Sequence, residues 1–371
     1  MPMPANEIEL AEAVRSATGP LSIRGGGTRP IGRPVVGEVL SVAGLSGITL
    51  HEPGALTLVA RAGTPLTEVE TTLAAAGQRL AFEPMDHRAL LGTSGTPTIG
   101  AVVAANVAGP RRVQVGSARD FLLGLRCVTG RGEVVKSGGR VMKNVTGYDL
   151  ARLMAGSYGT LGVISEVALK VLPQVESAAM LVLPGLDPRR SVVAMSAALG
   201  SPFEVTGAAY DPEAAMTYLR IEGFAGSVSY RAARLADLLI PFGVAAITLD
   251  GGQMQRCWEG IRDVTAFADR PGDVWRISVK PSDTPGITLA LNMPFRLDWG
   301  GGLIWVLAPE GSDLRAKIGH FAGHATLIRA DAATRAAIAP FHPEAPSVAA
   351  LTRGLRAQFD PRAILNPGLM G

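Results

Sequence analysis

The stretch Ser22–Gly32 reads SIRGGGTRPIG, in which three consecutive glycines follow a predicted strand at Leu21–Arg24. Glycine loses more backbone freedom on folding than any other residue, so a glycine triplet is either a flexible turn or a place where a partner needs bare backbone. Successive amide N–H groups in a tight loop form a concave site for an anion such as a phosphate. The stretch fits neither the P-loop pattern nor the G-x-G-x-x-G fingerprint, because Pro30 stands where a helix would begin.

Two more glycine-rich stretches follow in the chain. Gly92–Arg112 reads GTSGTPTIGAVVAANVAGPRR, and its small residues leave room for a flat ligand to approach the backbone. Gly138–Glu166 reads GGRVMKNVTGYDLARLMAGSYGTLGVISE. One such stretch is compatible with an ordinary loop, but three in succession, each beside a predicted strand, indicate a ligand site.

Composition excludes several classes of protein. The 371 residues have a hydrophobic content of 47% and a formal net charge of +3, and their mean hydropathy is +0.25. No apolar run reaches the roughly 18–20 residues of a membrane helix, and the acidic N-terminal stretch is unlike a signal peptide. The basic residues are scattered, which argues against a nucleic-acid surface. The two cysteines are too few for a disulfide framework or a zinc site.

The chain divides into two parts with different patterns of predicted strands and helices. Up to Pro173, predicted strands alternate with short helices; one helix is expected over 64–76, with Thr64 as its N-cap and Pro65 at its first position. Residues 121–139 are expected to form a hairpin. From Gln174 to about Ala339, strands alternate with amphipathic helices, which is typical of an α+β unit with helices on one face of a sheet. We expect Leu297–Leu307 to be either a buried strand with a bulge or a strand facing a ligand.

These motifs together resemble the FAD-binding domain of the vanillyl-alcohol oxidase / p-cresol methylhydroxylase (PCMH) type. The resemblance is closest to the smaller FAD-binding (E) subunits of bacterial glycolate oxidases. It is carried by RGGGTRPIG, Glu83-Pro84, GPRRVQVGSARDFLLG (109–124), VMKNVTGYDLARLMAGSYGTLGVISEVALKVLP (141–173), AGHATLIR (322–329) and FDPRAILNPG (359–368). It implies an α+β protein with a two-subdomain PCMH-type FAD-binding domain at 1–173. A smaller α+β cap domain at 174–340 and a C-terminal segment at 341–371 that returns to the FAD domain complete the expected organisation.

The resemblance also assigns roles to residues. In the first loop the expected pyrophosphate ligands are Arg24, Gly25, Gly26, Gly27, Thr28, Arg29 and Gly32, and a side chain at Gly26 is expected to enter the phosphate nest. Residues expected along the flavin and its ribityl chain are Pro84, Thr98, Gly100, Ala104 and Asn106. Ser117, Arg119 and Asp120 either contact the cofactor or form a salt-bridged corner. Gly162, Val163 and Ile164 are expected to present a backbone edge to the adenine, and Asn366 is expected to close over the isoalloxazine ring.

The departures from the family pattern are also informative. Thr28 stands where covalent relatives often have histidine, so non-covalent FAD is expected. The cap lacks the H-x-G-D-G-N-x-H cluster of relatives that oxidise 2-hydroxy acids. It offers only His320 and His324, which a helix stop predicted at Gly323 separates, so no metal site is expected.

No residue is assigned a catalytic role. His51, His87 and His342 are isolated in the sequence. Arg276, Arg296 and Arg329 are candidates for holding a substrate carboxylate.

The expected function is that of a FAD-binding subunit of a multi-subunit glycolate (2-hydroxy-acid) oxidase or dehydrogenase, which accepts or relays electrons. The implied partners are a larger FAD subunit, an iron–sulfur subunit and a small 2-hydroxy acid. The alternatives are a stand-alone FAD-dependent oxidoreductase and a FAD-less structural subunit. The expected location is cytoplasmic, with attachment to the inner face of the membrane through partners left open.

Overall fold

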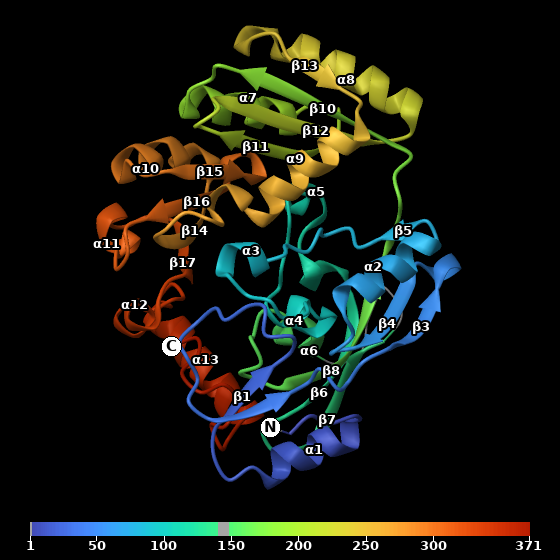
Figure 1. Cartoon of the computed structure of the whole chain (residues 1–371), viewed down its shortest axis with the longest axis vertical. Coiled ribbons are helices and arrows are strands. Elements are labelled where there is room, and N and C mark those ends of the chain that lie inside the picture. The colour runs from blue at the N-terminus through green and yellow to red at the C-terminus, as the bar shows by residue number, and fades with distance from the viewer. Residues whose placement is uncertain (1, 140–147) are drawn as a thin grey trace. The chain divides into compact units, whose positions relative to one another are not determined.

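The computed structural model describes residues 2–139 and 148–371 (Figure 1). The motif segment Val141–Gly147 therefore lies outside the described residues. The chain forms two compact units. Unit 1 comprises residues 1–108, 116–174 and 343–371, and unit 2 comprises residues 109–115 and 175–342. The polypeptide thus enters unit 2 briefly at 109–115 and returns to unit 1 for residues 116–174. It then forms the rest of unit 2 and ends in unit 1 with residues 343–371.

Unit 1 is built around a five-stranded antiparallel sheet of order β3-β4-β8-β6-β7. Unit 1 also contains two separate two-stranded sheets, β1-β2 (parallel) and β5-β9 (antiparallel). The strands are β1 (Leu21–Arg24), β2 (Glu38–Ser41), β3 (Ile48–Glu52), β4 (Thr57–Arg61), β5 (Gln78–Arg79), β6 (Leu122–Val128), β7 (Val134–Gly138), β8 (Val163–Lys170) and β9 (Leu172–Pro173). The antiparallel pairing of β6 with β7 confirms the hairpin predicted for residues 121–139.

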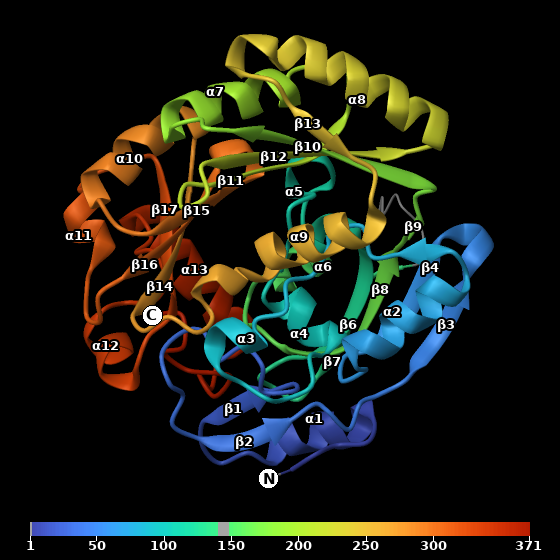
Figure 2. The same ribbon diagram turned by 45° about the horizontal axis from the view of Figure 1, so that its top comes forward.

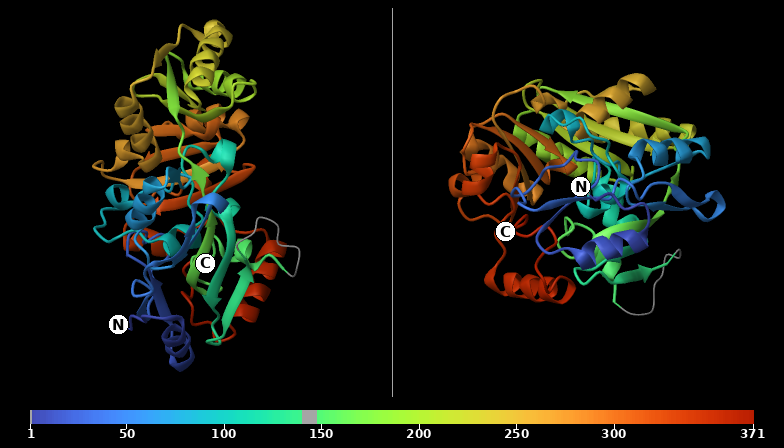
Figure 3. Two further views of the ribbon diagram at one scale, coloured as in Figure 1. Left: turned by 90° about the vertical axis from the view of Figure 1, so that its right-hand side faces the viewer. Right: turned by 60° about the horizontal axis from the view of Figure 1, so that its bottom comes forward.

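The helices of unit 1 are α1 (Glu7–Ser16), α2 (Leu66–Ala75), α3 (Arg88–Leu91), α4 (Ile99–Ala104), α6 (Leu150–Met154) and α13 (Pro346–Phe359). Three of them, α1, α2 and α13, have ten or more residues, and the other α-helices are short. The apolar side of α1 packs on β1, β2 and the C-terminal residues Ile364 and Leu365 in one buried cluster. Figure 3 shows α13, the red helix, on the outside of this unit, and none of its side chains is fully buried.

The start of α2 differs from the prediction. The helix begins at Leu66, and Pro65 rather than Thr64 occupies the N-cap position. The hydroxyl group of Thr64 instead donates to the Arg61 carbonyl oxygen at 2.7 Å and accepts from the Gly47 amide at 3.0 Å. The prediction of Thr64 as the cap was wrong because its two partners lie at the end of β4 and in the loop before β3, outside the helix sequence from which the prediction was made.

Unit 2 is an eight-stranded antiparallel sheet of order β13-β10-β12-β11-β15-β16-β14-β17. The strands are β10 (Ser177–Pro184), β11 (Val205–Asp211), β12 (Met216–Gly223), β13 (Ala246–Thr248), β14 (Asp273–Val279), β15 (Phe295–Asp298), β16 (Leu303–Ala308) and β17 (Gly323–Arg329). The helices are α5 (Arg112–Val115), α7 (Pro188–Leu199), α8 (Ala225–Leu239), α9 (Gly251–Asp263), α10 (Thr284–Leu291), α11 (Leu314–Ile318) and α12 (Ala332–Ala337).

Helices cover both faces of this sheet, not one as expected (Figure 2). The main core lies between one face and the helices α7, α8 and α10. A second, smaller cluster lies on the other face, where Met254 and Trp258 of α9 pack on Met180 and Ala209. The stretch Leu297–Leu307 is also not one strand: β15 and β16 form an antiparallel pair, and the turn Trp299–Gly301 joins them.

Candidate functional site

The first glycine-rich loop of unit 1 lies directly against the second. A Cβ atom built on Gly26 would lie 1.5 Å from the Thr96 carbonyl oxygen, and one on Gly95 would lie 1.8 Å from the Gly26 carbonyl oxygen. Glycine is needed at these positions because two backbones touch there. The expectation that a side chain at Gly26 would enter the phosphate nest was therefore wrong. Gly27 is different: its φ is +71° and a Cβ atom there would meet nothing within 4 Å, so no neighbouring backbone requires glycine at this position.

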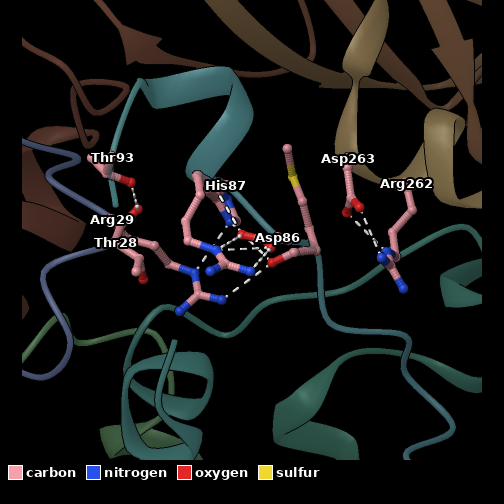
Figure 4. Close-up of polar contacts among 9 residues, drawn as sticks. Thr28, Arg29, Asp86, His87, Thr93, Arg262 and Asp263 are labelled. Atoms are coloured by element: carbon pink, nitrogen blue, oxygen red, sulfur yellow. Dashed lines mark hydrogen bonds and ion pairs between the residues drawn. The ribbon is translucent and has the colours of Figure 1, made fainter. Parts of the chain in front are cut away.

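Arg29 is held by a segment far away in the sequence (Figure 4). Its Nε donates to His87 Nδ1 at 3.1 Å and its Nη2 donates to the Met85 carbonyl oxygen at 3.1 Å. Its Nη1 is buried and has no hydrogen-bond partner. Burial lowers the pKa of Arg29 to about 10, and the nearby Asp86 carboxylate partly offsets that effect. His87, which looked isolated in the sequence, is thus part of the loop's support.

The second stretch carries another unpartnered polar atom. Thr98 occupies the N-cap position of α4 without a side-chain cap hydrogen bond, and its buried Oγ1 has no partner. Gly100 abuts Ala62, where a Cβ atom would lie 2.5 Å from the alanine methyl carbon. The Ala104 carbonyl oxygen accepts a hydrogen bond from the Tyr158 amide at 2.9 Å. The structure therefore brings Gly25, Thr98 and the start of α4 to one place beside the first loop.

Ser117, Arg119 and Asp120 form a hydrogen-bonded corner. The Asp120 carboxylate accepts from the Ser117 amide at 2.8 Å and from its hydroxyl group at 2.9 Å, which is a capping box. The Arg119 amide donates to the Asn106 side-chain oxygen at 3.0 Å. These hydrogen bonds fix the corner at the end of the second stretch, and contact of its residues with the cofactor stays a prediction.

Gly162, Val163 and Ile164 lie at the start of β8. Val163 and Ile164 are buried and pair with Val128 and Cys127 of β6. The pairing of β4 with β8 spans only Glu166–Lys170 on β8. The three residues therefore lie beyond the end of β4, and the adenine contact stays a prediction.

The side chain of Asn366 joins two segments of unit 1 by hydrogen bonds. Its side-chain oxygen accepts from the Ile23 amide at 2.8 Å and its amide group donates to the Tyr158 carbonyl oxygen at 2.8 Å. It thereby ties the strand before the glycine loop to the segment before β8. Gly32 packs closely against the same C-terminal segment, because a Cβ atom there would lie 2.7 Å from the Leu369 carbonyl oxygen.

Two other predicted residues have simpler surroundings. The side chain of Arg24 is exposed at the end of β1 and donates to Ser22 Oγ at 3.3 Å. Pro84 is buried and follows Glu83, whose φ is +47°.

Left-handed backbone at non-glycine residues recurs near the predicted site. Glu83, Asn106, Tyr158 and Asn366 all have φ between +44° and +52°. Such conformations cost about 1–3 kcal/mol each and are often found at ligand sites. The unpartnered Arg29 Nη1 and Thr98 Oγ1 are polar atoms that fit an oxygen-rich ligand such as a pyrophosphate.

Unit 2 contains a separate cationic cluster around Trp299. The guanidinium carbons of Arg112 and Arg276 lie 4.8 and 5.0 Å from the Trp299 ring centroid. Burial lowers the pKa of His324, and the nearby positive charges of Arg276, His342 and Arg112 lower it further. Sequence reasoning missed Arg112 because it belongs to the short excursion at 109–115.

The other two candidate arginines of the cap have structural partners. Arg296 pairs with Glu213 at 2.6 Å and with Asp211 at 3.4 Å. Arg329 donates to four backbone carbonyl groups at 272, 267, 268 and 270. Of the three cap arginines considered, only Arg276 lies in the Trp299 cluster, so Arg296 and Arg329 are corrected to structural roles.

The two neighbouring cap histidines lie on different elements. His320 follows α11 and His324 lies on β17. Within residues 2–139 and 148–371, no three His, Cys, Asp or Glu side chains gather into a group that could hold a metal ion. In the same ranges, no helix combines the length and hydropathy needed to cross a bilayer.

Comparisons with known proteins identify the family of the chain. Residues 3–138 match the family described as FAD binding domain. The chain is 36% identical over 372 residues to glycolate oxidase subunit GlcE of Escherichia coli (strain K12), covering 98% of this chain and 95% of that protein. D-lactate dehydrogenase of Archaeoglobus fulgidus is 32% identical over 184 residues, which cover 49% of this chain and 40% of that protein.

A solved structure matches the fold of the chain. Alkyldihydroxyacetonephosphate synthase matches with a TM-score of 0.69 and 16% identity, covering 98% of this chain and 76% of that one. At this identity the match speaks for the fold alone. The identity to GlcE extends over nearly all of both chains, and the matched domain contains both the first glycine loop and the second stretch. The chain therefore belongs to the family of FAD-linked oxidoreductases with a PCMH-type FAD-binding domain that includes glycolate oxidase subunit GlcE.

Proposed function

We propose that this chain is the FAD-binding subunit of a multi-subunit oxidase of glycolate or a related 2-hydroxy acid, and that it holds FAD without a covalent bond. The observation that carries the proposal is the 36% identity to glycolate oxidase subunit GlcE over 98% of the chain. Thr28 supports the non-covalent mode, since a threonine in the first loop lacks the nucleophilic ring nitrogen of a histidine.

The residues that would hold the pyrophosphate are the amides of Gly25–Gly27, Arg29 and Thr98. Backbone amides supply an anion nest, and Arg29 supplies a positive charge whose Nη1 needs an acceptor. Bound FAD supplies the ability to accept a hydride or electrons and pass them on. The task of this chain is to bind the cofactor and to exclude water from it. Unpartnered polar atoms at two predicted cofactor residues weigh against a FAD-less structural subunit.

A second candidate function rests on the cationic cluster in unit 2. Arg112 and Arg276 on Trp299, with His324 nearby, are suited to a small carboxylate. His324 is a candidate to take the proton of a substrate hydroxyl group, because its lowered pKa keeps the imidazole neutral at neutral pH. This cluster favours a chain that oxidises a 2-hydroxy acid by itself.

Partner subunits belong to the proposal as well. The implied ones are a larger FAD subunit and an iron–sulfur subunit, and the chain would operate in the cytoplasm or reach the membrane surface through them. The test is steady-state oxidation of glycolate and D-lactate with an artificial acceptor, by the chain alone and after reconstitution with those subunits. We expect turnover only in the reconstituted complex. Turnover of the chain alone that is lost in both His324→Ala and Arg276→Gln would establish the second candidate instead.

A further inference from the structure

The guanidinium group of Arg29 is held from one side only. Its Nε and Nη2 donate to His87 Nδ1 and to the Met85 carbonyl oxygen, both in the segment before α3. These two bonds fix the plane of the group. Its Nη1 remains buried without a hydrogen-bond partner, next to the glycine loop that precedes it in the chain. Figure 4 shows Arg29 and His87 directed toward each other.

The Arg29 bond determines the protonation state of His87. An arginine Nε–H only donates, so Nδ1 of His87 must accept, and the imidazole must be neutral with its proton on Nε2. The same Nδ1 lies 3.2 Å from the Met85 carbonyl oxygen. In the neutral Nε2–H tautomer it carries no proton and donates no hydrogen bond to that oxygen. A protonated imidazole would direct an N–H group at the Arg29 N–H group and would add a second positive charge beside it.

The other charged groups here do not titrate near neutral pH. Asp86 binds Arg88 at 2.7 Å. Burial by itself would raise the pKa of Asp86, but the hydrogen bonds and charge of Arg88, together with the charge of Arg29, leave it below its usual value. Tyr158 contributes an electrostatic interaction with Arg29, and a tyrosine ordinarily titrates near pH 10. His87 is the group among them that can change charge between about pH 5 and 8.

We propose that neutral His87 is a positioning residue that holds Arg29 so that its Nη1 donates to one oxygen of the FAD pyrophosphate. FAD binding then requires the unprotonated imidazole. Its affinity is full above the titration of His87 and falls as the pH is lowered through it. This inference rests on the proposed FAD site, and it adds a residue that pattern matching did not select.

The test is the dissociation constant of FAD, measured by flavin fluorescence at about pH 8 and about pH 5.5. Four variants accompany the wild type. His87→Asn places an oxygen where Nδ1 stands but does not titrate, and His87→Leu removes the acceptor. Arg29→Gln removes the charge. His51→Gln is the matched control, because His51 bonds to Gln78 on another part of unit 1.

We expect wild type and His51→Gln to bind FAD more weakly at the lower pH. His87→Asn should bind within about threefold of wild type at the higher pH and show little pH dependence. His87→Leu and Arg29→Gln should each bind about tenfold more weakly than wild type at the higher pH. Thermal unfolding checks the fold of each variant, and His87→Asn carries the test if His87→Leu does not fold.

Three outcomes would overturn the inference. A pH dependence that persists in His87→Asn removes His87 as its cause. Wild-type affinity in Arg29→Gln would show that the pyrophosphate lies elsewhere, although FAD binding itself would stand. A wild-type chain that binds no FAD at any pH would refute the proposed function together with this inference.

Discussion

Replacing Gly26 by alanine is the perturbation that most directly probes how the two glycine-rich stretches are joined. The added methyl group would lie 1.5 Å from the Thr96 carbonyl oxygen and 2.5 Å from its carbonyl carbon. Both atoms belong to the backbone, so no side chain can rotate away. To restore a tolerable separation of about 3 Å, the two loops must part by roughly 1.5 Å.

The expected cost has two components. Overpacking of this kind destabilises a protein by about 1–3 kcal/mol, which corresponds to roughly 2–12 °C in the unfolding midpoint of a unit of this size. Moving the loop also misplaces its amides and Arg29. The loss of two charge-assisted hydrogen bonds, at about 1.5 kcal/mol each or more, would weaken FAD binding by about a hundredfold.

The assays are differential scanning calorimetry and FAD titration, with two matched variants. Gly19→Ala, just before β1, has nothing within 4 Å of the new methyl group, and it should behave as wild type. Gly27→Ala also has open space around it but requires φ near +71°, so it should cost only about 1–2 kcal/mol of stability. A Gly26→Ala protein with wild-type melting and wild-type FAD affinity would refute the reasoning.

Three further expectations can be checked separately. Asn366→Ala removes two part-buried hydrogen bonds, so unfolding should require about 1–3 kcal/mol less free energy; an unchanged urea midpoint would contradict the stabilising role of Asn366. Glu222→Leu removes the carboxylate that pairs with the buried Arg111 and Arg220 of unit 2 and should destabilise that unit by about 3–5 kcal/mol, whereas the double variant with Arg111→Met should recover part of the loss, because Arg220 still lacks this carboxylate; equal losses in both variants would speak against the Arg111–Glu222 pair. Burial raises the pKa of Cys127 to about 12, so a disulfide reagent at about pH 8 should leave this thiol unmodified until guanidinium unfolds the chain. Rapid labelling of folded protein at Cys127 would show that β6 is not packed as described.

Local sequence patterns were sufficient for much of the fold. The strand predicted at Leu21–Arg24 is β1 with the same bounds, and the amphipathic helices predicted between Gln174 and Ala339 include α7. These elements have apolar positions at strand or helix spacing and clear end signals: Asp187 caps α7, and Pro188 is its first residue. The hairpin at 297–307 was missed because its apolar run continues through the turn, and only the positive φ of Trp299, Gly300 and Gly301 reverses the chain.

The candidate site depends more strongly on contacts that sequence spacing does not reveal. Asn366 lies 343 residues from Ile23, and His87 lies 58 residues from Arg29. Motif matching selected Asn366 and Arg29 individually, but not the hydrogen bonds that determine what each can do. His87 carries no motif, and only folding brings its ring to a loop that needs an acceptor. In the same way, the excursion 109–115 brings Arg112 into unit 2 and to Trp299.

The central claim is that the two glycine-rich stretches of unit 1 bind FAD without a covalent bond. The most direct measurement is the flavin content of the purified chain, saturated with FAD, freed of excess cofactor and precipitated with acid. The account predicts about one FAD per chain, all of it in the supernatant, and much less after the same treatment of Arg29→Gln. Flavin that stays in the pellet would contradict the non-covalent mode, and a colourless protein after saturation would contradict the site itself.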